Sequence, residues 1–338
     1  MELTIKTLEN TNEIAWNDLV QSSSHGTIFH TVDWLRLVQE QTNAELLPLM
    51  FYKGSQLVAI YPIFLQKRGS IKIALSPPSR SYMLYLGPVI ADYESSKQDK
   101  KESTFIQIQQ EMDKYIFEIK KCKYARIRSS PGLYDSRPFQ WSGYTVVPHY
   151  TYRIDLTRGL DHVWEQFDKP VRRSINQSQR EGLTVRAGNK EDLDFIHDSL
   201  YKRYIEQGIK PTDYKKYLLT IYQKFYPDNL KIFVAEYKGQ RIGGTISLCY
   251  KNILYSWVGM PKINLSGISP NDLIRWEVIK WAQTNGLEYY ELMDAGDDPR
   301  LRHFKSKFNP DLVIWYSATK YSSCVYKAVE KLFNIVKK

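Results

Sequence analysis

One stretch of the sequence, residues 286–309, has the residue types and spacing of a chemical site. A short run of alternating apolar residues predicts a strand, and Asp294 stands at its end, where a carboxylate does little for packing. A loop with glycine and proline follows, and Lys305 then stands between Phe304 and Phe308. An ammonium in a partly dry cleft can stabilise an oxyanion or a phosphate, and a carboxylate can orient an amine or accept its proton. We therefore interpret this stretch as part of a site.

Several common catalytic patterns are missing from the sequence. It contains no P-loop, no glycine-rich dinucleotide loop between a strand and a helix, no zincin motif and no nucleophile elbow. The six histidines are scattered, and none is paired at the spacing of metal ligands. We therefore expect no metal and no cofactor. P-loop phosphoryl transfer, zinc hydrolysis and dinucleotide-dependent redox chemistry are disfavoured.

Length and charge narrow the class of protein. With 338 residues, 43% of them hydrophobic, two domains with substantial cores are expected. The net charge of +10 favours an anionic partner such as RNA, a nucleotide-linked substrate or an anionic membrane surface, with a generic basic surface as the alternative. The three separated cysteines fit reduced thiols in the cytoplasm. Without a signal peptide or an apolar run of roughly 18 residues, only peripheral membrane contact is expected. The sequence does not indicate an oligomeric state.

The order of predicted elements is repeated in the two halves of the chain. Segments 51–57 and 236–242 each predict a hairpin turn around Lys-Gly, and each is followed by two strands, a helix and a further strand. The repeated order predicts a duplicated α/β domain with mixed sheets. The expected strands of the first half are 46–53, 56–66, 70–75, 83–90 and 125–129, with a helix at 103–121; those of the second half are 241–250, 253–260 and 288–294, with a helix at 271–284. The expected domains are 1–150 and 151–317, with a C-terminal helix at 318–338 packed on the first.

Between the two copies lies a basic segment, residues 169–186, which predicts a helix that ends at Gly182 and leads into a strand. A solvated charged face is the favoured interpretation of this helix. The alternative is that Arg172, Arg173 and Arg180 contact RNA or phosphate.

These residues together resemble the FemAB family of aminoacyl transferases, a branch of the GNAT acyltransferase superfamily. Four stretches carry the likeness, and they span nearly the whole chain: F-H-T-V-D-W-L-R, K-P-V-R-R-S-I-N-Q-S-Q-R-E-G-L-T-V, S-P-N-D-L-I-R-W-E-V-I-K-W-A, and Y-Y-E-L-M-D-A-G with F-K-S-K-F-N. Two departures stand in the last of these. Asn309 replaces the usual closing glycine, where asparagine also tolerates a left-handed backbone, and Ala295 displaces the glycine after the strand-end aspartate.

The resemblance implies two tandem GNAT-like domains facing a shared cleft. Typical members move an amino acid from aminoacyl-tRNA to the amine of a UDP-linked or lipid-linked cell-wall peptide, and a related branch serves polysaccharide acylation. Acyl transfer to an amine requires loss of a proton, stabilisation of an oxyanion and alignment of the reactants. The resemblance places Lys305 near the acyl ester or a phosphate, and gives Asp294 the role of orienting or deprotonating the amine.

The remaining candidates are expected to bind substrate. Arg36, beside Trp34, matches the family's cation for substrate phosphates. Arg80 and Tyr82, after a Ser-Pro-Pro-Ser loop, are weaker candidates for the wall of the cleft. Phe304 and Phe308 are expected to hold the stem of the lysine between them.

Two other functions stay open. An acyl-CoA-dependent transferase acting on a sugar or small molecule would usually carry [QR]-x-x-G-x-[GA] between a strand and a helix, whereas residues 260–273 read M-P-K-I-N-L-S-G-I-S-P-N-D-L. A non-catalytic module that kept the fold and binds an anionic polymer is the second alternative, because fold does not guarantee activity. The intact lysine and aspartate count against it.

Overall fold

The computed structural model describes residues 3–208, 214–259 and 269–323, and it divides the chain into two compact units. Among the described residues, unit 1 comprises 3–150 and 314–323, and unit 2 comprises 151–208, 214–259 and 269–313. The boundaries fall inside strands β7 (Thr145–Asp155) and β13 (Asp311–Tyr321), so each of these strands contributes residues to both units.

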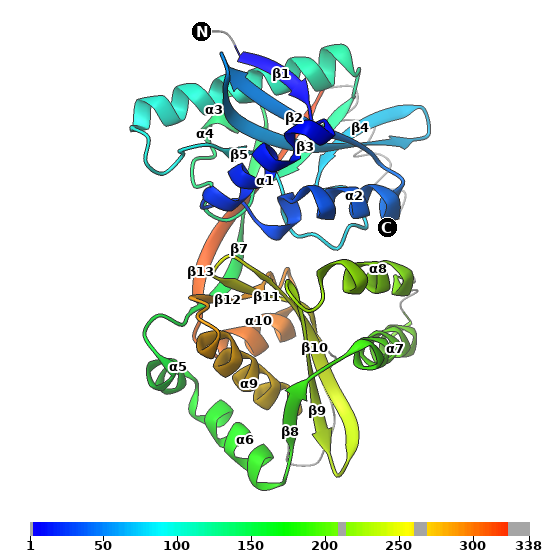
Figure 1. Ribbon diagram of the computed structural model, residues 1–338, viewed down its shortest axis with the longest axis vertical. Helices are drawn as coiled ribbons and strands as arrows, with labels where there is room; N and C mark the ends of the chain where they lie inside the picture. Colours follow the sequence, from blue (N-terminus) through cyan, green and yellow to red (C-terminus); the bar gives the residue numbers. More distant parts are fainter. Residues whose placement is uncertain (1–2, 209–213, 260–268, 324–338) are drawn as a thin grey trace. The chain divides into compact units, whose positions relative to one another are not determined.

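Unit 1 is built on a mixed sheet with the strand order β1-β2-β3-β4-β6-β13 (Figure 1). The strands are β1 (Leu3–Thr7), β2 (Glu45–Lys53), β3 (Gln56–Arg68), β4 (Ile71–Ser76) and β6 (Tyr124–Arg128), with the short β5 (Val89–Ile90) paired to β3. Strands β4 and β6 are parallel, and the other pairings within this unit are antiparallel. The parallel pair requires a crossover, which the helix between β4 and β6 supplies.

The helices of unit 1 pack on this sheet through apolar stripes. They are η1 (Asn10–Asn12), α1 (Glu13–Ser22), η2 (Ile28–His30), α2 (Val32–Thr42), α3 (Gln98–Asp113), the π-helical turn η3 (Lys114–Ile119) and α4 (Arg137–Trp141). The helix α3 buries Phe105, Ile108 and Met112 at a helical spacing. These residues join the core together with alternate residues of β2 and β3 such as Phe51 and Tyr61.

Unit 2 repeats this plan with the strand order β8-β9-β10-β11-β12-β7. The strands are β8 (Thr184–Ala187), β9 (Leu230–Tyr237), β10 (Gln240–Tyr250), β11 (Ile253–Gly259) and β12 (Tyr289–Met293). The helices are α5 (Leu160–Gln166), α6 (Lys169–Arg180), α7 (Lys190–Glu206), α8 (Lys215–Phe225), α9 (Pro270–Thr284) and α10 (Pro299–Ser306). Strands β11 and β12 are parallel, as β4 and β6 are in unit 1, so the expected duplication of element order is confirmed.

The helices of unit 2 lie on both faces of its sheet (Figure 1). Helices α6 and α9 bury apolar residues in one core together with Tyr290 and Leu292 of β12. On the other side α7 approaches β10 so closely that a Cβ on Gly244 would lie 2.8 Å from Cδ1 of Ile196. The register of β10 against β9 also shifts between Arg241 and Gly243. The glycine pair therefore allows both the bulge in β10 and the close packing of α7 against it.

Strands β11 and β12 stop pairing before they reach their carboxyl ends. Their pairing runs from Ile253–Tyr289 to Tyr255–Glu291, while β11 continues to Gly259 with β10 as its partner. Beyond this last pair, β11 and β12 are no longer hydrogen-bonded to each other. Side chains from α9 and α10 fill that position, and they form the site described below.

Three expectations about elements need correction. Only Val89–Ile90 of the expected strand 83–90 is a strand, because Gly87 takes a left-handed backbone angle (φ of 82°) and Pro88 has no N–H to donate; before them Leu86 forms an isolated bridge to Ser129. The helix expected at 103–121 begins earlier, at Gln98. Residues 318–321 of the expected C-terminal helix belong to β13, where Ala318 pairs with Ile127, and residues 324–338 lie outside the described part of the chain.

Candidate active site at the end of strand β12

The ammonium of Lys305 lies at the carboxyl end of β12. Its Nζ donates hydrogen bonds to the backbone oxygens of Met293, at 3.1 Å, and of Asp294, at 2.7 Å. Met293 has a left-handed backbone (φ of 61°), which turns the chain sharply as the strand ends. Helix α10 then begins after Asp298, whose carboxylate accepts hydrogen bonds from the first amides of the helix. Lys305, in the last turn, is thereby directed back to the strand end.

Burial changes the acidity of this lysine. Only 9% of Lys305 is exposed, and burial together with repulsion from the nearby Arg275 guanidinium lowers its pKa to about 8. The carboxylates of Asp294 and Glu291 oppose this shift without cancelling it. At neutral pH the side chain is mostly an ammonium in a poorly solvated position, where its charge acts strongly on a nearby anion.

A second cation, Arg275 of α9, lies in the same cluster. Its Nη1 donates to Ser256 Oγ at 2.8 Å and also to Tyr290 Oη. Its guanidinium lies 5.3 Å from the ring centroid of Tyr290 and 5.7 Å from that of Phe304. We did not expect this residue from the sequence, although Asp272, Arg275 and Ile279 recur at a helical spacing, which is a signal for an arginine facing inward.

The two aromatic rings hold a different lysine from the one expected. Lys307 Nζ, rather than that of Lys305, lies over the rings of Phe304 and Phe308, at 4.6 Å and 5.5 Å from their centroids. Helical spacing accounts for the first of these contacts, because Phe304 and Lys307 are three residues apart; Phe308 is adjacent to Lys307 and meets it where the helix ends, at Ser306. Phe308 is buried against Phe167, with 5.1 Å between ring centroids, and it therefore packs in the core.

Two carboxylates flank the strand end. Asp294, half-buried, accepts a hydrogen bond from the Gly296 amide at 2.7 Å through Oδ1, and so shapes the loop before α10. Glu291 is fully buried and accepts hydrogen bonds from Thr151 Oγ1, at 3.2 Å, and from Arg153 Nη2, at 2.8 Å. Glu291 is thus neutralised by its own arginine, and Asp294 is the more accessible acid of the pair.

Four of the residues expected at the site belong to unit 1. Trp34 is completely buried, with its ring 5.2 Å from that of Phe29, so in this conformation it acts through packing. Arg36 donates through both terminal nitrogens to the carboxylate of Glu13, at 2.5 Å and 3.1 Å. In the loop after β4, Arg80 and Tyr82 are exposed.

The basic helix is confirmed as α6. It buries Val171 and Ile175, and it presents Arg173 and Arg180 to solvent, with Arg172 half-buried. Within the described residues these three arginines form no ion pair. The helix therefore has an apolar face that packs in unit 2 and a cationic face that is open to an anionic partner.

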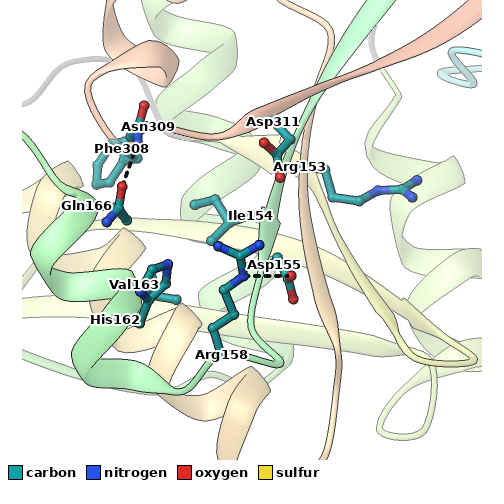
Figure 2. A pocket seen from close by; sticks show the side chains of 10 residues that line it. All are labelled: Arg153, Ile154, Asp155, Arg158, His162, Val163, Gln166, Phe308, Asn309 and Asp311. Carbon is teal, nitrogen blue, oxygen red and sulfur yellow. Dashed lines mark hydrogen bonds and ion pairs between the residues drawn. The ribbon is translucent and has the colours of Figure 1, made fainter.

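A small cavity, about 120 Å³ in volume, lies on unit 2 beside β7 and α5 (Figure 2). Its polar wall includes the Asp155–Arg158 ion pair, at 3.7 Å, and a hydrogen bond of 3.0 Å from Asn309 to Gln166. Asn309 has a left-handed backbone (φ of 50°), so the turn that glycine usually closes in the FemAB signature is preserved by asparagine, as expected.

Two features, a metal site and a membrane-spanning helix, are absent from the described residues. No group of three or more histidine, cysteine, aspartate or glutamate side chains there is arranged to hold a metal ion. In the same part of the chain, no helix has both the length and the apolar character needed to cross a membrane.

Comparison with known proteins gives a family match for part of the chain. Residues 166–306 match the acetyltransferase (GNAT) domain family. This match supports an acyltransferase domain of the GNAT class in that part of the chain. The matched GNAT segment includes β12, Arg275 and Lys305, so the cluster at the strand end belongs to this domain. No curated protein matches the sequence.

Solved structures extend the fold to the whole chain. A crystal structure of FemX aligns with a TM-score of 0.72 and 11% identity, over 93% of this chain and 96% of that one. A tandem GNAT protein from the clavulanic acid biosynthesis pathway aligns with a TM-score of 0.57 and 9% identity, over 95% and 99%. The C-terminal domain of a putative lysylphosphatidylglycerol synthetase from Agrobacterium fabrum gives 0.56 and 14%, over 92% of each. The chain therefore has the fold of two GNAT-like units in tandem.

Proposed function

We propose that the protein transfers an aminoacyl group from an activated donor, such as aminoacyl-tRNA, to an amine of an anionic acceptor. The acceptor would be a UDP-linked or lipid-linked cell-wall precursor, or a related sugar-linked amine. The observation that carries the proposal is the buried ammonium of Lys305 at the end of β12, inside the acyltransferase domain.

The chemistry follows from the groups at the strand end. The acceptor amine attacks the ester carbonyl, a carbon–nitrogen bond forms, and the bond from the carbonyl carbon to the donor oxygen breaks. Negative charge develops on the carbonyl oxygen, and an ammonium fixed in a poorly solvated position stabilises that charge better than one in water. Asp294 is the acid placed to orient the amine or to accept its proton, directly or through water.

The choice of donor rests on two features. The segment before α9 lacks the glycine-rich sequence that CoA-dependent GNAT domains usually carry, which favours aminoacyl-tRNA. The cationic face of α6, with Arg173 and Arg180, offers contacts to RNA phosphates. An acyl-CoA-dependent N- or O-acyltransferase is the second candidate, because the domain matches a family described as acetyltransferases. We place the reaction in the cytoplasm, where charged tRNA and UDP-linked precursors occur.

The test is a direct comparison of donors. The purified full chain is incubated with a labelled aminoacyl-tRNA or with labelled acetyl-CoA, together with a UDP-linked cell-wall peptide, and products are identified by mass spectrometry. The proposal predicts an added aminoacyl group only with the tRNA donor. Acetylated product with acetyl-CoA alone would replace it by the second candidate. Saturable binding of an anionic polymer without any transfer would favour a non-catalytic module.

A further inference from the structure

The cluster at the end of β12 holds two cations that have no carboxylate partner in the part of the chain that the structure describes. Lys305 Nζ donates only to two backbone carbonyls, and Arg275 donates only to the neutral hydroxyls of Ser256 and Tyr290. Lys305 is buried and Arg275 is half-buried, and cations that are withdrawn from water in this way are normally paired with an anion. The same unit follows that rule elsewhere, because Arg153 is paired with Glu291 at 2.8 Å and Lys307 with Asp272 at 2.5 Å.

Neither of the nearby acids forms an ion pair with these two cations in the described part of the chain. Asp294 uses one carboxylate oxygen for the Gly296 amide, and Glu291 is bonded to Thr151 and Arg153. The Arg275 guanidinium lies 5.7 Å from the ring of Phe304, the residue next to Lys305, and its charge helps to lower the pKa of that lysine, so the two cations are neighbours. An arrangement of this kind is unfavourable by itself and becomes favourable when an anion binds between the cations.

Arg275 also has hydrogen-bonding capacity left over. Its Nε is buried and has no acceptor among the described residues, while the aromatic rings of Tyr290 and Phe304 fix the plane of the guanidinium. A guanidinium presents five N–H donors in a rigid fork that matches phosphate oxygens, and a lysine adds a compact point charge. The guanidinium fork of Arg275 therefore suits a phosphate group, and the ammonium of Lys305 beside it can still act on the ester carbonyl.

We propose that Arg275, beside Lys305, binds a phosphate group of the acyl donor. This inference rests on the proposed function for the identity of the donor, and the binding itself does not. The phosphate would be a phosphodiester if the donor is an RNA, and a pyrophosphate if the donor is a coenzyme A thioester. When the anion binds, it offsets the repulsion between the two cations and raises the pKa of Lys305, so the lysine stays charged during transfer.

The test measures binding of inorganic pyrophosphate to the full chain by isothermal titration calorimetry. Variants are Arg275→Gln, Arg275→Lys and a matched control, Arg300→Gln, whose side chain is 81% exposed and pairs with Asp298. Arg275→Gln should weaken binding about 10- to 100-fold, as expected when a charge-assisted hydrogen bond is removed. Arg275→Lys should recover only part of the affinity, and Arg300→Gln should bind like the wild type. Thermal melting of each variant confirms that the fold is intact.

A second readout excludes a purely structural role for Arg275. In protein with labelled lysine, NMR titration should show that pyrophosphate raises the pKa of Lys305 in the wild type and does not in Arg275→Gln. Wild-type affinity in a folded Arg275→Gln variant would overturn the proposal. So would an equal reduction of affinity in Arg300→Gln, or no binding of pyrophosphate to the wild type.

Competition identifies the source of the phosphate. Displacement of pyrophosphate by an acceptor-stem RNA, and not by coenzyme A, supports an RNA donor; the reverse supports a coenzyme A donor; displacement by neither overturns the assignment to the donor. The outcomes also separate this inference from the proposed function. Arg275-dependent binding without aminoacyl transfer removes the proposed function alone. Aminoacyl transfer that is unchanged in Arg275→Gln removes this inference alone.

Discussion

Lys307 and Asp272 form an ion pair of 2.5 Å between the end of α10 and the first turn of α9. Their side chains are 19% and 4% exposed, and the ammonium also lies over the rings of Phe304 and Phe308. Two lysines that are two residues apart in the sequence therefore make different contacts. Lys307 joins two helices of unit 2, and Lys305 reaches the end of β12, where it has no carboxylate partner among the described residues.

Lys307→Ala should lower the free energy of unfolding by about 3–5 kcal/mol, because it leaves the buried carboxylate of Asp272 without a counter-charge. Urea unfolding of the wild type and the variant measures this difference. The double variant Lys307→Met, Asp272→Leu should recover most of the stability, since it removes both charges together. A reduction below about 1 kcal/mol in Lys307→Ala would place this pair with ordinary surface ion pairs.

The rate of transfer should depend on pH through Lys305. Its pKa of about 8 means that the ammonium is lost as the pH rises through 8, so its contribution to catalysis should decline there. Arginine stays charged in this range. The ratio of the wild-type kcat/KM to that of Lys305→Arg reports the free enzyme, and between about pH 6.5 and 9.5 it should therefore fall above pH 8. A ratio that rises instead would indicate that the neutral amine of Lys305 acts as a base.

The same pKa has a consequence for stability. The folded state has the lower pKa, so between pH 8 and the usual lysine value of 10.5 the unfolded chain holds more protons than the folded one. Stability contributed by this group therefore rises with pH across that window. Its burial penalty is fully present below pH 8.

Much of the fold could be predicted because its signals are local. The repeated Lys-Gly hairpins, the apolar spacing of α9 and the proline-containing start of α6 each lie within a short window of sequence. The strand expected at 83–90 is confirmed only at Val89–Ile90, because the left-handed Gly87 interrupts the segment and leaves no trace in an apolar pattern. The last strand was mistaken for part of a helix because its partner, β6, lies far away in the sequence.

The site was predicted in outline and not in detail. The order of a strand, a loop and then a lysine in the sequence predicted that Lys305 lies near a strand end, as it does in the structure. The sequence did not indicate that Lys307 would lie over both rings, because its contact with Phe304 follows from helical spacing and its contact with Phe308 from the way the chain leaves the helix. Arg275 was missed since its partners, Ser256 and Tyr290, come from two strands that only the tertiary fold brings to one helix. Trp34 was expected at a binding surface and is buried.

Binding of tRNA should depend strongly on salt if the cationic face of α6 contacts phosphates. Each neutralised phosphate releases counterions, so affinity should fall linearly with the logarithm of salt concentration. Charge reversal of Arg172, Arg173 and Arg180 to glutamate should weaken binding and flatten that slope, by about 0.7–0.9 for each phosphate that is no longer neutralised. Filter binding between about 50 and 200 mM salt measures both quantities. An unchanged affinity and slope would indicate that α6 is a solvated surface helix with no role in RNA binding.

The most direct test of the account is kcat for aminoacyl transfer by the wild type, Lys305→Ala, Lys305→Arg and a control, Lys280→Ala. Lys280 lies on α9, where it pairs with Glu277, away from the strand end. Lys305→Ala should reduce kcat about 10²- to 10³-fold with the fold intact, the usual cost of losing a preorganised oxyanion donor. Lys305→Arg should not restore full activity, because a planar fork places its charge differently from a compact ammonium. Wild-type turnover by Lys305→Ala, or an equal reduction of kcat in Lys280→Ala, would contradict a catalytic role for Lys305.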